Sequence, residues 1–258
     1  MKIAVFYKKE LECDSIVNRV DKMIIQHGFI KDDLNPEVVL FIGGDGTFLR
    51  AVHYYLPLID KLKFVGINKG SLGFFSSFNE DELDALFVSL KDSLLESQSF
   101  RLLEANCENK TVYAINEIRI ENPFHTLISE VYVNDQFLET FRGNGLVISS
   151  SLGSSAYNKS LGGSVVLPNL EVMQLSEIAP INNRVYRPLL SSLIIDSNSK
   201  IRLRGDFTNV VLGYDHLIEN EQKANEIEFL LSAKKITILN KKDHSFINLL
   251  NKAFIEGK

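Results

Sequence analysis

The chain has 258 residues, of which 45% are apolar and 24% charged, with a formal net charge of −5. A chain of this length can bury a sizeable core in one large domain or two modest ones. The acidic balance argues against a general nucleic-acid binder, which is usually basic. The N-terminal apolar stretch is too short for a signal peptide, and no apolar run approaches the roughly 20 residues of a membrane-spanning helix. These features predict a globular, cytoplasmic protein that binds neither nucleic acid nor membrane.

Cysteine and histidine give no sign of a disulfide framework or of a protein-bound metal. The two cysteines, Cys13 and Cys107, are expected to be reduced thiols, as is usual for a cytosolic protein. The five histidines do not follow the spacing of metal ligands, so no metal-ligating residue is predicted.

The first hundred residues alternate between strand and helix patterns. Short apolar runs predict buried strands at residues 2–7, 38–42 and 64–67. Apolar residues at helical spacing predict a helix from Asp14, which suits the N-cap, to Gly28, a helix after Thr47, and an amphipathic helix over residues 80–95. Strands that alternate with helices imply a parallel sheet covered on both faces.

The pattern changes after about residue 98, where β-rich stretches dominate. They are expected at residues 111–121, 126–133, 136–141, 192–196, 200–203 and 209–214, with a hairpin turn at Asn134-Asp135 and one short helix around residues 155–159. Such strands favour a β-sandwich-like domain. Phe246, Leu249, Leu250 and Phe254 predict a final helix.

The resulting fold prediction is an α/β domain with a parallel sheet at residues 1–98, followed by a β-rich domain at residues 99–242. The C-terminal helix, about residues 243–258, is expected to return to the first domain. Because no Pro/Gly linker separates the halves, they are expected to share an interface with a ligand cleft.

The central motif is Gly43-Gly44-Asp45-Gly46-Thr47, which follows the predicted strand 38–42. Its glycines can adopt positive φ and allow a close approach of another molecule, and its amides lead into a helix N-terminus, an arrangement suited to phosphate. No Lys follows, so the motif is not a Walker A loop. Asp45 would be an unfavourable anion there unless it accepts a proton from an attacking hydroxyl or helps to hold a phosphate-bound Mg²⁺. The alternative is an ordinary turn with Asp as a turn residue.

Four further residues, at three places in the chain, carry side chains that suit a ligand, and each place has a structural alternative. Asn116-Glu117 is polar within an apolar strand and needs partners, either a ligand or neighbouring backbone. Tyr157, in a Gly/Ser-rich segment, offers an aromatic face or a core side chain. Arg142 suits a phosphate or carboxylate, or it is a surface residue.

Taken in order, the motifs between about residues 40 and 216 resemble the NAD kinase family. They include the GGDGT turn, the loop 66–75, Asn116-Glu117, the segment 142–163, the segment 176–182 and Tyr214-Asp215-His216. The GGDGT turn alone is shared with diacylglycerol and sphingosine kinases and, more distantly, with phosphofructokinases. The resemblance implies an ATP-dependent kinase that phosphorylates the 2′-hydroxyl of the adenosine ribose of NAD to give NADP. It also implies Mg²⁺ or another divalent cation with ATP, and a homodimer or homotetramer.

The same resemblance implies roles for particular residues. Asp45 would be the catalytic base, and Asn116 and Glu117 would hold the adenine and ribose of NAD in a dinucleotide-binding β-rich domain. The nucleotide-binding positions would be Gly44, Gly46, Thr47, Arg50, Asn116, Glu117, Arg142, Asn144, Ser155, Ala156, Tyr157, Asn158, Lys159, Ser160 and Ala179. Asp215 has two possible roles: it contacts the second nucleotide, or it is a turn residue.

Two departures from the family pattern lie on the binding side. Asn144 stands where the family usually has Asp, which removes a charge and adds two donors. The segment 149–152 has Ser and Leu where the family commonly has Thr and Pro.

Two other functions stay open. A lipid kinase would be expected to need a membrane-facing surface that this acidic chain lacks. A non-catalytic dinucleotide sensor is supported only by Asn144 and opposed by the intact GGDGT turn.

Overall fold

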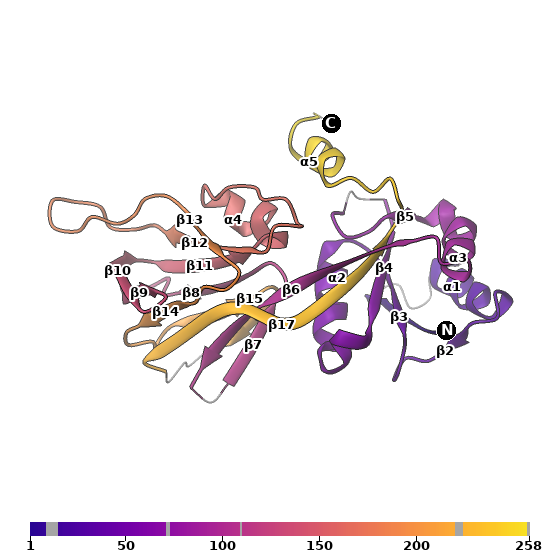
Figure 1. Cartoon of the computed structure of the whole chain (residues 1–258), viewed down its shortest axis with the longest axis horizontal. Coiled ribbons are helices and arrows are strands. Elements are labelled where there is room, and N and C mark those ends of the chain that lie inside the picture. Colours follow the sequence, from indigo (N-terminus) through magenta and orange to yellow (C-terminus); the bar gives the residue numbers. More distant parts are fainter. Residues whose placement is uncertain (9–14, 71–72, 109, 220–223, 257–258) are drawn as a thin grey trace. The chain divides into compact units, whose positions relative to one another are not determined.

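The computed structural model describes residues 1–8, 15–70, 73–108, 110–219 and 224–256. Cys13 and Asp14, the expected N-cap of the first helix, lie outside these ranges. The chain forms two compact units, one from Met1–Phe100 with Lys234–Lys258 and the other from Arg101–Ala233 (Figure 1). Each unit is described by itself.

The first unit is built on a parallel sheet. Strands β1 (Lys2–Tyr7), β3 (Val38–Ile42) and β4 (Lys63–Asn68) pair in the order β4-β3-β1. The two-residue strands β2 (Ile30–Lys31) and β5 (Phe78–Asn79) pair with β1 and β4, and the end of β17 (Glu226–Asn240) pairs with β4. The predicted strands at 2–7, 38–42 and 64–67 are confirmed. Every residue of β3 is buried, which explains its continuous apolar run.

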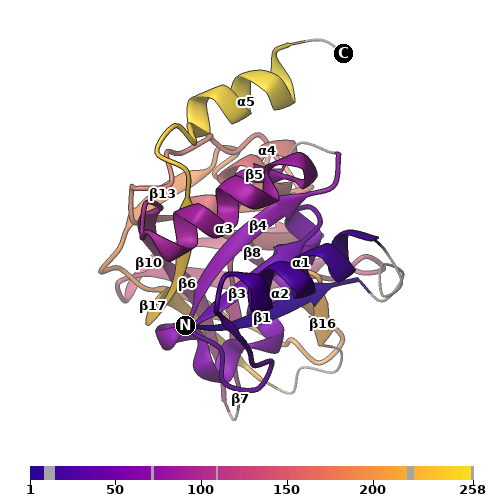
Figure 2. The same ribbon diagram turned by 90° about the vertical axis from the view of Figure 1, so that its right-hand side faces the viewer.

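Helices cover both faces of this sheet. Residues of α1 (Ser15–Gln26) and α3 (Leu83–Lys91) pack in one core with Leu40, Ile42 and Val65. Figure 2 shows these two helices in front of strands β1, β3 and β4. On the opposite face Phe48 of α2 (Asp45–Tyr54) contacts the rings of Phe41 and Phe64, as the alternation of side chains along a strand requires. A 3₁₀ helix, η2 (Leu56–Lys61), follows α2.

The helix expected over residues 80–95 is shorter than the apolar pattern indicated. It consists of a 3₁₀ turn, η3 (Glu80–Glu82), and α3, which ends at Lys91. Ser93 adopts a left-handed φ of 55°, a conformation that ends helices. Strand β6 (Glu96–Cys107) begins shortly afterwards.

The second unit is a sandwich of two antiparallel layers. One layer contains β10 (Gln136–Gly143), β9 (Leu127–Val133), β14 (Ile201–Arg204) and the first part of β17, together with β6 and β7 (Lys110–Ala114). The other has the order β13 (Leu193–Asp196), β12 (Val172–Ile178), β11 (Gly145–Ser150), β8 (Glu117–Glu121), β15 (Val211–Tyr214) and β16 (Leu217–Glu219). Apolar side chains of both layers form one core, including Ile118, Ile148, Leu203 and Phe229. The predicted β-sandwich-like architecture is confirmed.

Three local features of the second unit differ from the sequence pattern or refine it. The β stretch expected at 111–121 is two strands, β7 and β8, which belong to different layers. The expected hairpin turn joins β9 to β10, with positive φ at Asn134 and Asp135. The predicted short helix consists of η4 (Leu152–Ser155) and α4 (Tyr157–Ser160).

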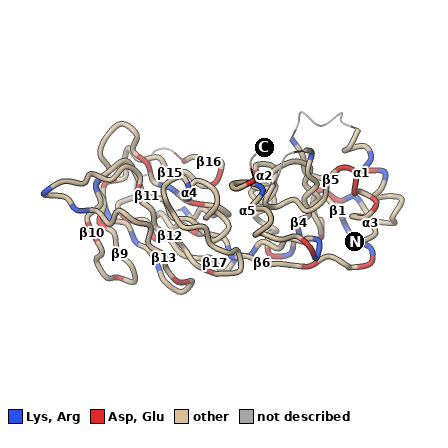
Figure 3. Tube along the Cα trace, turned by 90° about the horizontal axis from the view of Figure 1, so that it is seen from above, with Lys and Arg blue, Asp and Glu red and all other residues tan. Residues whose placement is uncertain are grey.

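The chain ends in helix α5 (Phe246–Phe254), which belongs to the first unit. Ser245 caps it by accepting a hydrogen bond from the amide of Asn248. The rings of Phe246 and Phe254 contact Phe74, although no residue of the helix is buried. None of the helices in the described ranges has the length and apolar character needed to cross a bilayer. Basic and acidic residues are interspersed along both units (Figure 3).

Candidate functional site

The glycine turn leads from β3 into α2 and requires glycine at its first position. Gly43 has φ +140°, and a Cβ there would lie 2.5 Å from the hydroxyl oxygen of Thr47, which is buried. Gly44 is the N-cap of α2, and its carbonyl accepts from the amides of Thr47 and Phe48. Gly46 is exposed and has open space around its Cα. The turn therefore combines one sterically obligatory glycine with one position where a ligand can approach the backbone.

Asp45 lies in the first turn of α2, and both of its carboxylate oxygens are held by backbone amides. Oδ2 accepts from the amide of Phe74 at 3.1 Å and Oδ1 from the amide of Phe75 at 3.2 Å. Gly73 makes this approach possible, because a Cβ at that position would lie 3.0 Å from Oδ1. Burial raises the pKa of Asp45 above its ordinary value, and the two amides oppose that shift. A fixed carboxylate with a raised pKa is suited to accept a proton near neutral pH.

A divalent cation at this turn would depend on the phosphates that it accompanies. Asp45 is one carboxylate, and it retains lone pairs beyond those used by the two amides. Within the described ranges, no three His, Cys, Asp or Glu side chains come together as metal ligands. Magnesium is commonly bound through one or two carboxylates plus substrate phosphates. The residues here fit a cation that arrives with a nucleotide, to which Asp45 could offer a carboxylate oxygen. Arg50, also predicted to bind nucleotide, is exposed on α2.

In the second unit Asn116 and Glu117 lie at the start of β8. The amides of Ile115 and Asn116 both donate to the carboxylate of Asp215, each at 2.8 Å. Asp215 adopts φ 50° in the turn between β15 and β16, so it acts as a turn residue that also holds this strand end. The Oδ1 atom of Asn116 and the Oε2 atom of Glu117 are buried and have no hydrogen-bond partner among the described residues. Buried acceptors are nearly always satisfied, so a ligand with suitably placed donors would find two open acceptors at this strand end.

The electrostatic environment of Glu117 makes its ionised form costly. Burial raises the pKa of Glu117 to about 7, the negative charge of Asp215 contributes, and Arg119 opposes the shift. Only 5% of Glu117 is exposed. A ligand hydroxyl or amide that donates to Glu117 would stabilise the ionised form.

Arg119 lies beside Glu117 although none of the sequence motifs includes it. Its guanidinium lies 3.2 Å from Glu121, 3.9 Å from Glu117 and 5.7 Å from the centre of the Tyr157 ring. Gly213 on the neighbouring strand leaves it room, because a Cβ there would lie 2.7 Å from the Arg119 Nε. The signal was present in the sequence, since Glu117, Arg119 and Glu121 alternate along β8 and must share one face.

The Ser/Gly-rich segment 151–163 packs closely on this strand end. A Cβ on Gly153 would lie 2.0 Å from the carbonyl oxygen of Asn116. The hydroxyl of Ser150 donates to the carbonyl of Ile115 and accepts from the amide of Gly153. Ser155, Ala156 and Tyr157 are half-buried beside it, whereas Lys159 and Ser160 are exposed. Asn158 is fully buried and accepts from the hydroxyl of Ser176 at 2.6 Å, so it has a structural contact whatever else it does.

Arg142, Asn144 and Ala179 lie around the junction of β10 and β11. The guanidinium of Arg142 stacks 4.4 Å above the ring of Tyr186. The side-chain amide of exposed Asn144 donates to the carbonyl of Asn122 at 3.2 Å, a contact that an Asp could not make. Ala179 adopts a positive φ of 43°, and its carbonyl approaches Gly143. The structure thus gives the unusual Asn144 a local partner.

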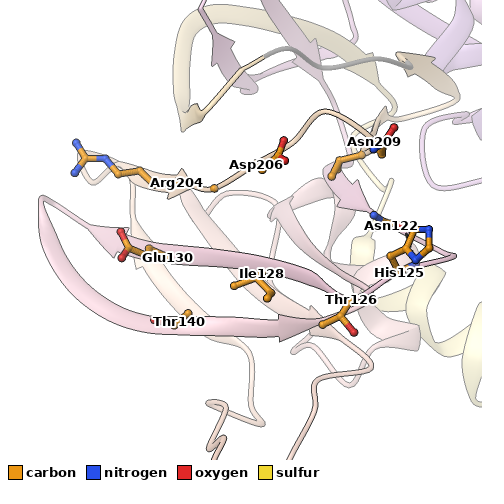
Figure 4. A pocket seen from close by; sticks show the side chains of 11 residues that line it. Asn122, His125, Thr126, Ile128, Glu130, Thr140, Arg204, Asp206 and Asn209 are labelled. Carbon is orange, nitrogen blue, oxygen red and sulfur yellow. Dashed lines mark hydrogen bonds between the residues drawn. The ribbon is translucent and has the colours of Figure 1, made fainter.

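A separate pocket of about 660 Å³ opens in the second unit and contains none of the predicted site residues. Figure 4 shows Arg204, Asp206 and Asn209 on one chain segment, and Ile128, Glu130 and Thr140 on the hairpin of β9 and β10. The pocket reaches Asn122, whose carbonyl is the partner of Asn144.

Comparisons with known proteins agree over the whole chain. Residues 2–123 match the family described as ATP-NAD kinase N-terminal domain, and residues 115–240 match the ATP-NAD kinase C-terminal domain. The chain is 35% identical to an NAD kinase of Latilactobacillus sakei subsp. sakei (strain 23K), over 100% of this chain and 99% of the relative. It is 31% identical to NAD kinase 1 of Bacillus anthracis, over 100% of both chains.

Solved structures share the fold. An NAD kinase from Archaeoglobus fulgidus, crystallised with ATP, has a TM-score of 0.77 at 22% identity and covers 98% of each chain. A yeast NADH kinase complexed with NADH has a TM-score of 0.78 at 20% identity, over 100% of this chain and 89% of that one. Fold, glycine turn and family matches together define an ATP-dependent phosphotransferase. The chain belongs to the NAD kinase family.

Proposed function

We propose that this NAD kinase transfers the γ-phosphoryl group of ATP to the 2′-hydroxyl of the adenosine ribose of NAD, with Asp45 as the catalytic base. The 2′-oxygen attacks the γ-phosphorus in line and forms a new P–O bond. The bond to the β,γ-bridging oxygen breaks, and ADP leaves with that electron pair. Asp45 takes the hydroxyl proton, so the products are NADP, ADP and a proton that the base returns to solvent. The observation that carries this proposal is the Asp45 carboxylate, fixed by two backbone amides beside the glycine turn.

The second unit is proposed to bind the dinucleotide. The unpartnered oxygens of Asn116 and Glu117 suit the amine of adenine and the hydroxyls of ribose, which are the donors that adenosine offers. The half-buried residues Ser155, Ala156 and Tyr157 would contact the same ligand. Arg142, Asn144, Ser160 and Ala179 are also assigned to the dinucleotide. In the free protein Arg142 stacks on Tyr186 and Asn144 donates to Asn122, whereas Ser160 is exposed.

ATP is proposed to bring Mg²⁺ to the glycine turn. The cation would neutralise charge on the phosphates, and the backbone of Gly44 and Gly46 would face them. The amide of Thr47 already donates to the carbonyl of Gly44, so Thr47 would support the turn. Asp45 performs proton transfer in this account, and a contact to the cation is compatible with the lone pairs that remain on its oxygens.

The test is the variant Asp45→Asn, assayed for NADP formation from NAD with ATP and Mg²⁺. We expect kcat to fall by about 10²–10⁴-fold, the usual span for a positioned general base, while NAD binding persists. Asp84→Asn is the matched control, because Asp84 is also in the first turn of a helix of the first unit and is exposed. Normal turnover by a folded Asp45→Asn protein would refute the assignment.

Two rival functions are separated by the same assay. The match to NAD kinases over the full chain favours NAD over a lipid acceptor, and phosphate transfer to diacylglycerol but not to NAD would reverse that preference. A non-catalytic sensor would bind NAD without forming NADP in the presence of ATP and Mg²⁺.

A homodimer or homotetramer in the cytoplasm is proposed for the active protein. Strands β10 and β13 end the two sheet orders of the second unit and expose apolar side chains, among them Phe137 and Ile194. Exposed apolar residues on edge strands favour association with a second copy. Light scattering coupled to gel filtration would give the mass of the assembly, and a monomer at assay concentration would contradict this proposal.

Cell fractionation tests the compartment, where ATP and NAD must both be available.

A further inference from the structure

Phe74 joins the proposed catalytic base to the C-terminal segment of the chain. Its amide donates to Oδ2 of Asp45 at 3.1 Å, and its carbonyl lies 3.3 Å from Nε2 of His244. Because a carbonyl can only accept, the Nε2 atom must carry the proton in this contact. The amide of Phe74 therefore binds Asp45, and its carbonyl binds His244.

The ring of Phe74 is held by the same C-terminal segment. It lies 5.7 Å from the ring of Phe246 and 6.2 Å from that of Phe254, which are at the two ends of α5. Lys241, just before His244, pairs with Glu82 and lies 4.6 Å above the ring of Phe78. The start of the segment is thus tethered to the body of the first unit.

The other amide donor to Asp45 is anchored differently. Phe75 is 7% exposed, and its ring stacks 4.4 Å from Phe48 of α2 inside the core. Phe74 is only half-buried and relies on the α5 contacts just described. One oxygen of Asp45 is therefore fixed by the core and the other by the C-terminal helix.

We infer that His244 is a positioning residue for catalysis, which acts through Phe74 to orient the carboxylate of Asp45. This inference rests on the proposed role of Asp45. Burial lowers the pKa of the His244 imidazole, so it is neutral at pH 7 and has one N–H to donate. Loss of this donor frees the Phe74 carbonyl, and the Phe74 amide can move away from Oδ2. Small displacements of a catalytic group are costly in rate, although substrate binding need not change.

The test compares His244→Ala with His244→Gln, which keeps an N–H donor at similar reach. We expect His244→Ala to lower kcat by roughly 10- to 100-fold with the Kd for NAD changed by less than about twofold, and His244→Gln to recover most of the rate. Ile247→Ala, at an exposed position of α5, the helix that follows His244, is the control and should keep normal turnover. Phe254→Ala, which removes a ring contact to Phe74, is a second variant if His244→Ala does not fold, and should lower kcat in the same direction.

A double-mutant cycle separates positioning from general stabilisation. If His244 acts through Asp45, His244→Ala should cause no further loss in the Asp45→Asn background, where residual turnover is still measurable. An equal fold-loss in both backgrounds, or full activity of His244→Ala in the wild-type background, would overturn the inference. If Asp45→Asn itself retained normal turnover, the proposed function would fail first, which distinguishes the two failures.

Discussion

The carboxylate of Asp215 accepts a hydrogen bond of 2.8 Å from the backbone amide of Asn116, 99 residues earlier in the chain. Its other oxygen accepts from the amide of Ile115 at the same distance. This clamp fixes the point where the chain passes from β7 to β8. It leaves the side-chain oxygen of Asn116 and one oxygen of Glu117 buried without a partner among the described residues, so the clamp and both open acceptors lie at one strand end.

The first prediction concerns this clamp. Asp215→Asn should lower the free energy of unfolding by about 1–3 kcal/mol, because one buried amide loses its acceptor. It should also weaken NAD binding, since Asn116 is no longer held in place. Denaturant titration and calorimetry measure the two effects. Asp135→Asn is the control, because Asp135 also has positive φ but lies exposed in a hairpin. Unchanged NAD affinity would separate Asp215 from the site.

The second prediction is a pH dependence of NAD affinity. The pKa of Glu117 is raised to about 7 in the free protein, and a ligand that donates to its carboxylate needs the ionised form. NAD affinity should therefore rise with pH up to about 7, by at most about tenfold per pH unit, and then level off. In the absence of NAD, the free energy of unfolding should fall as the pH rises from 4.5, the ordinary pKa of a Glu side chain, to about 7, the raised pKa of Glu117. Glu117→Gln should remove both dependences, and a pH dependence that persists in this variant would point to another group.

The third prediction concerns Arg119, whose charge opposes the raised pKa of Glu117. Arg119→Gln should move the midpoint of the pH dependence of NAD binding above that of the wild type, because the carboxylate loses its nearby positive charge. Kd values from about pH 6 to about pH 9, which bracket the raised pKa, give the midpoint. The control is Arg204→Gln. Arg204 lies on β14 and pairs with Glu226 of β17, so this variant should leave the midpoint unchanged. A midpoint that moved equally in both variants would indicate a general charge effect.

The fourth prediction separates two glycines of the same turn. Gly43→Ala should destabilise the protein by about 1–3 kcal/mol, because the backbone conformation is accessible essentially to glycine alone and the new Cβ meets Thr47. Gly46→Ala should fold normally, since its Cα faces open space, yet raise the KM for ATP if phosphate approaches the backbone there. Thermal unfolding and steady-state kinetics distinguish the outcomes. An unchanged KM in Gly46→Ala would exclude that position from the phosphate site.

Much of the fold could be predicted because its signals are local. The strands of the first unit are continuous apolar runs, and α1 buries the five apolar residues that recur at helical spacing. The end of α3 was misjudged because Leu94 and Leu95 continue the apolar pattern, whereas Ser93 has already left the helical conformation. The break between β7 and β8 was missed because apolar character continues through Ile115, and only the distant carboxylate of Asp215 marks the corner.

The sequence by itself determined which residues could perform chemistry, because a glycine turn, a carboxylate within it and a polar pair in an apolar strand are local features of composition and order. It did not determine what holds them. Chain packing brings the decisive groups together. It places the amides of Phe74 and Phe75 on Asp45. It also places the guanidinium of Arg119 beside Glu117, and His244 against Phe74. Hydrogen bonds and charge interactions act over a few ångströms, so only the tertiary structure decides which groups reach one another.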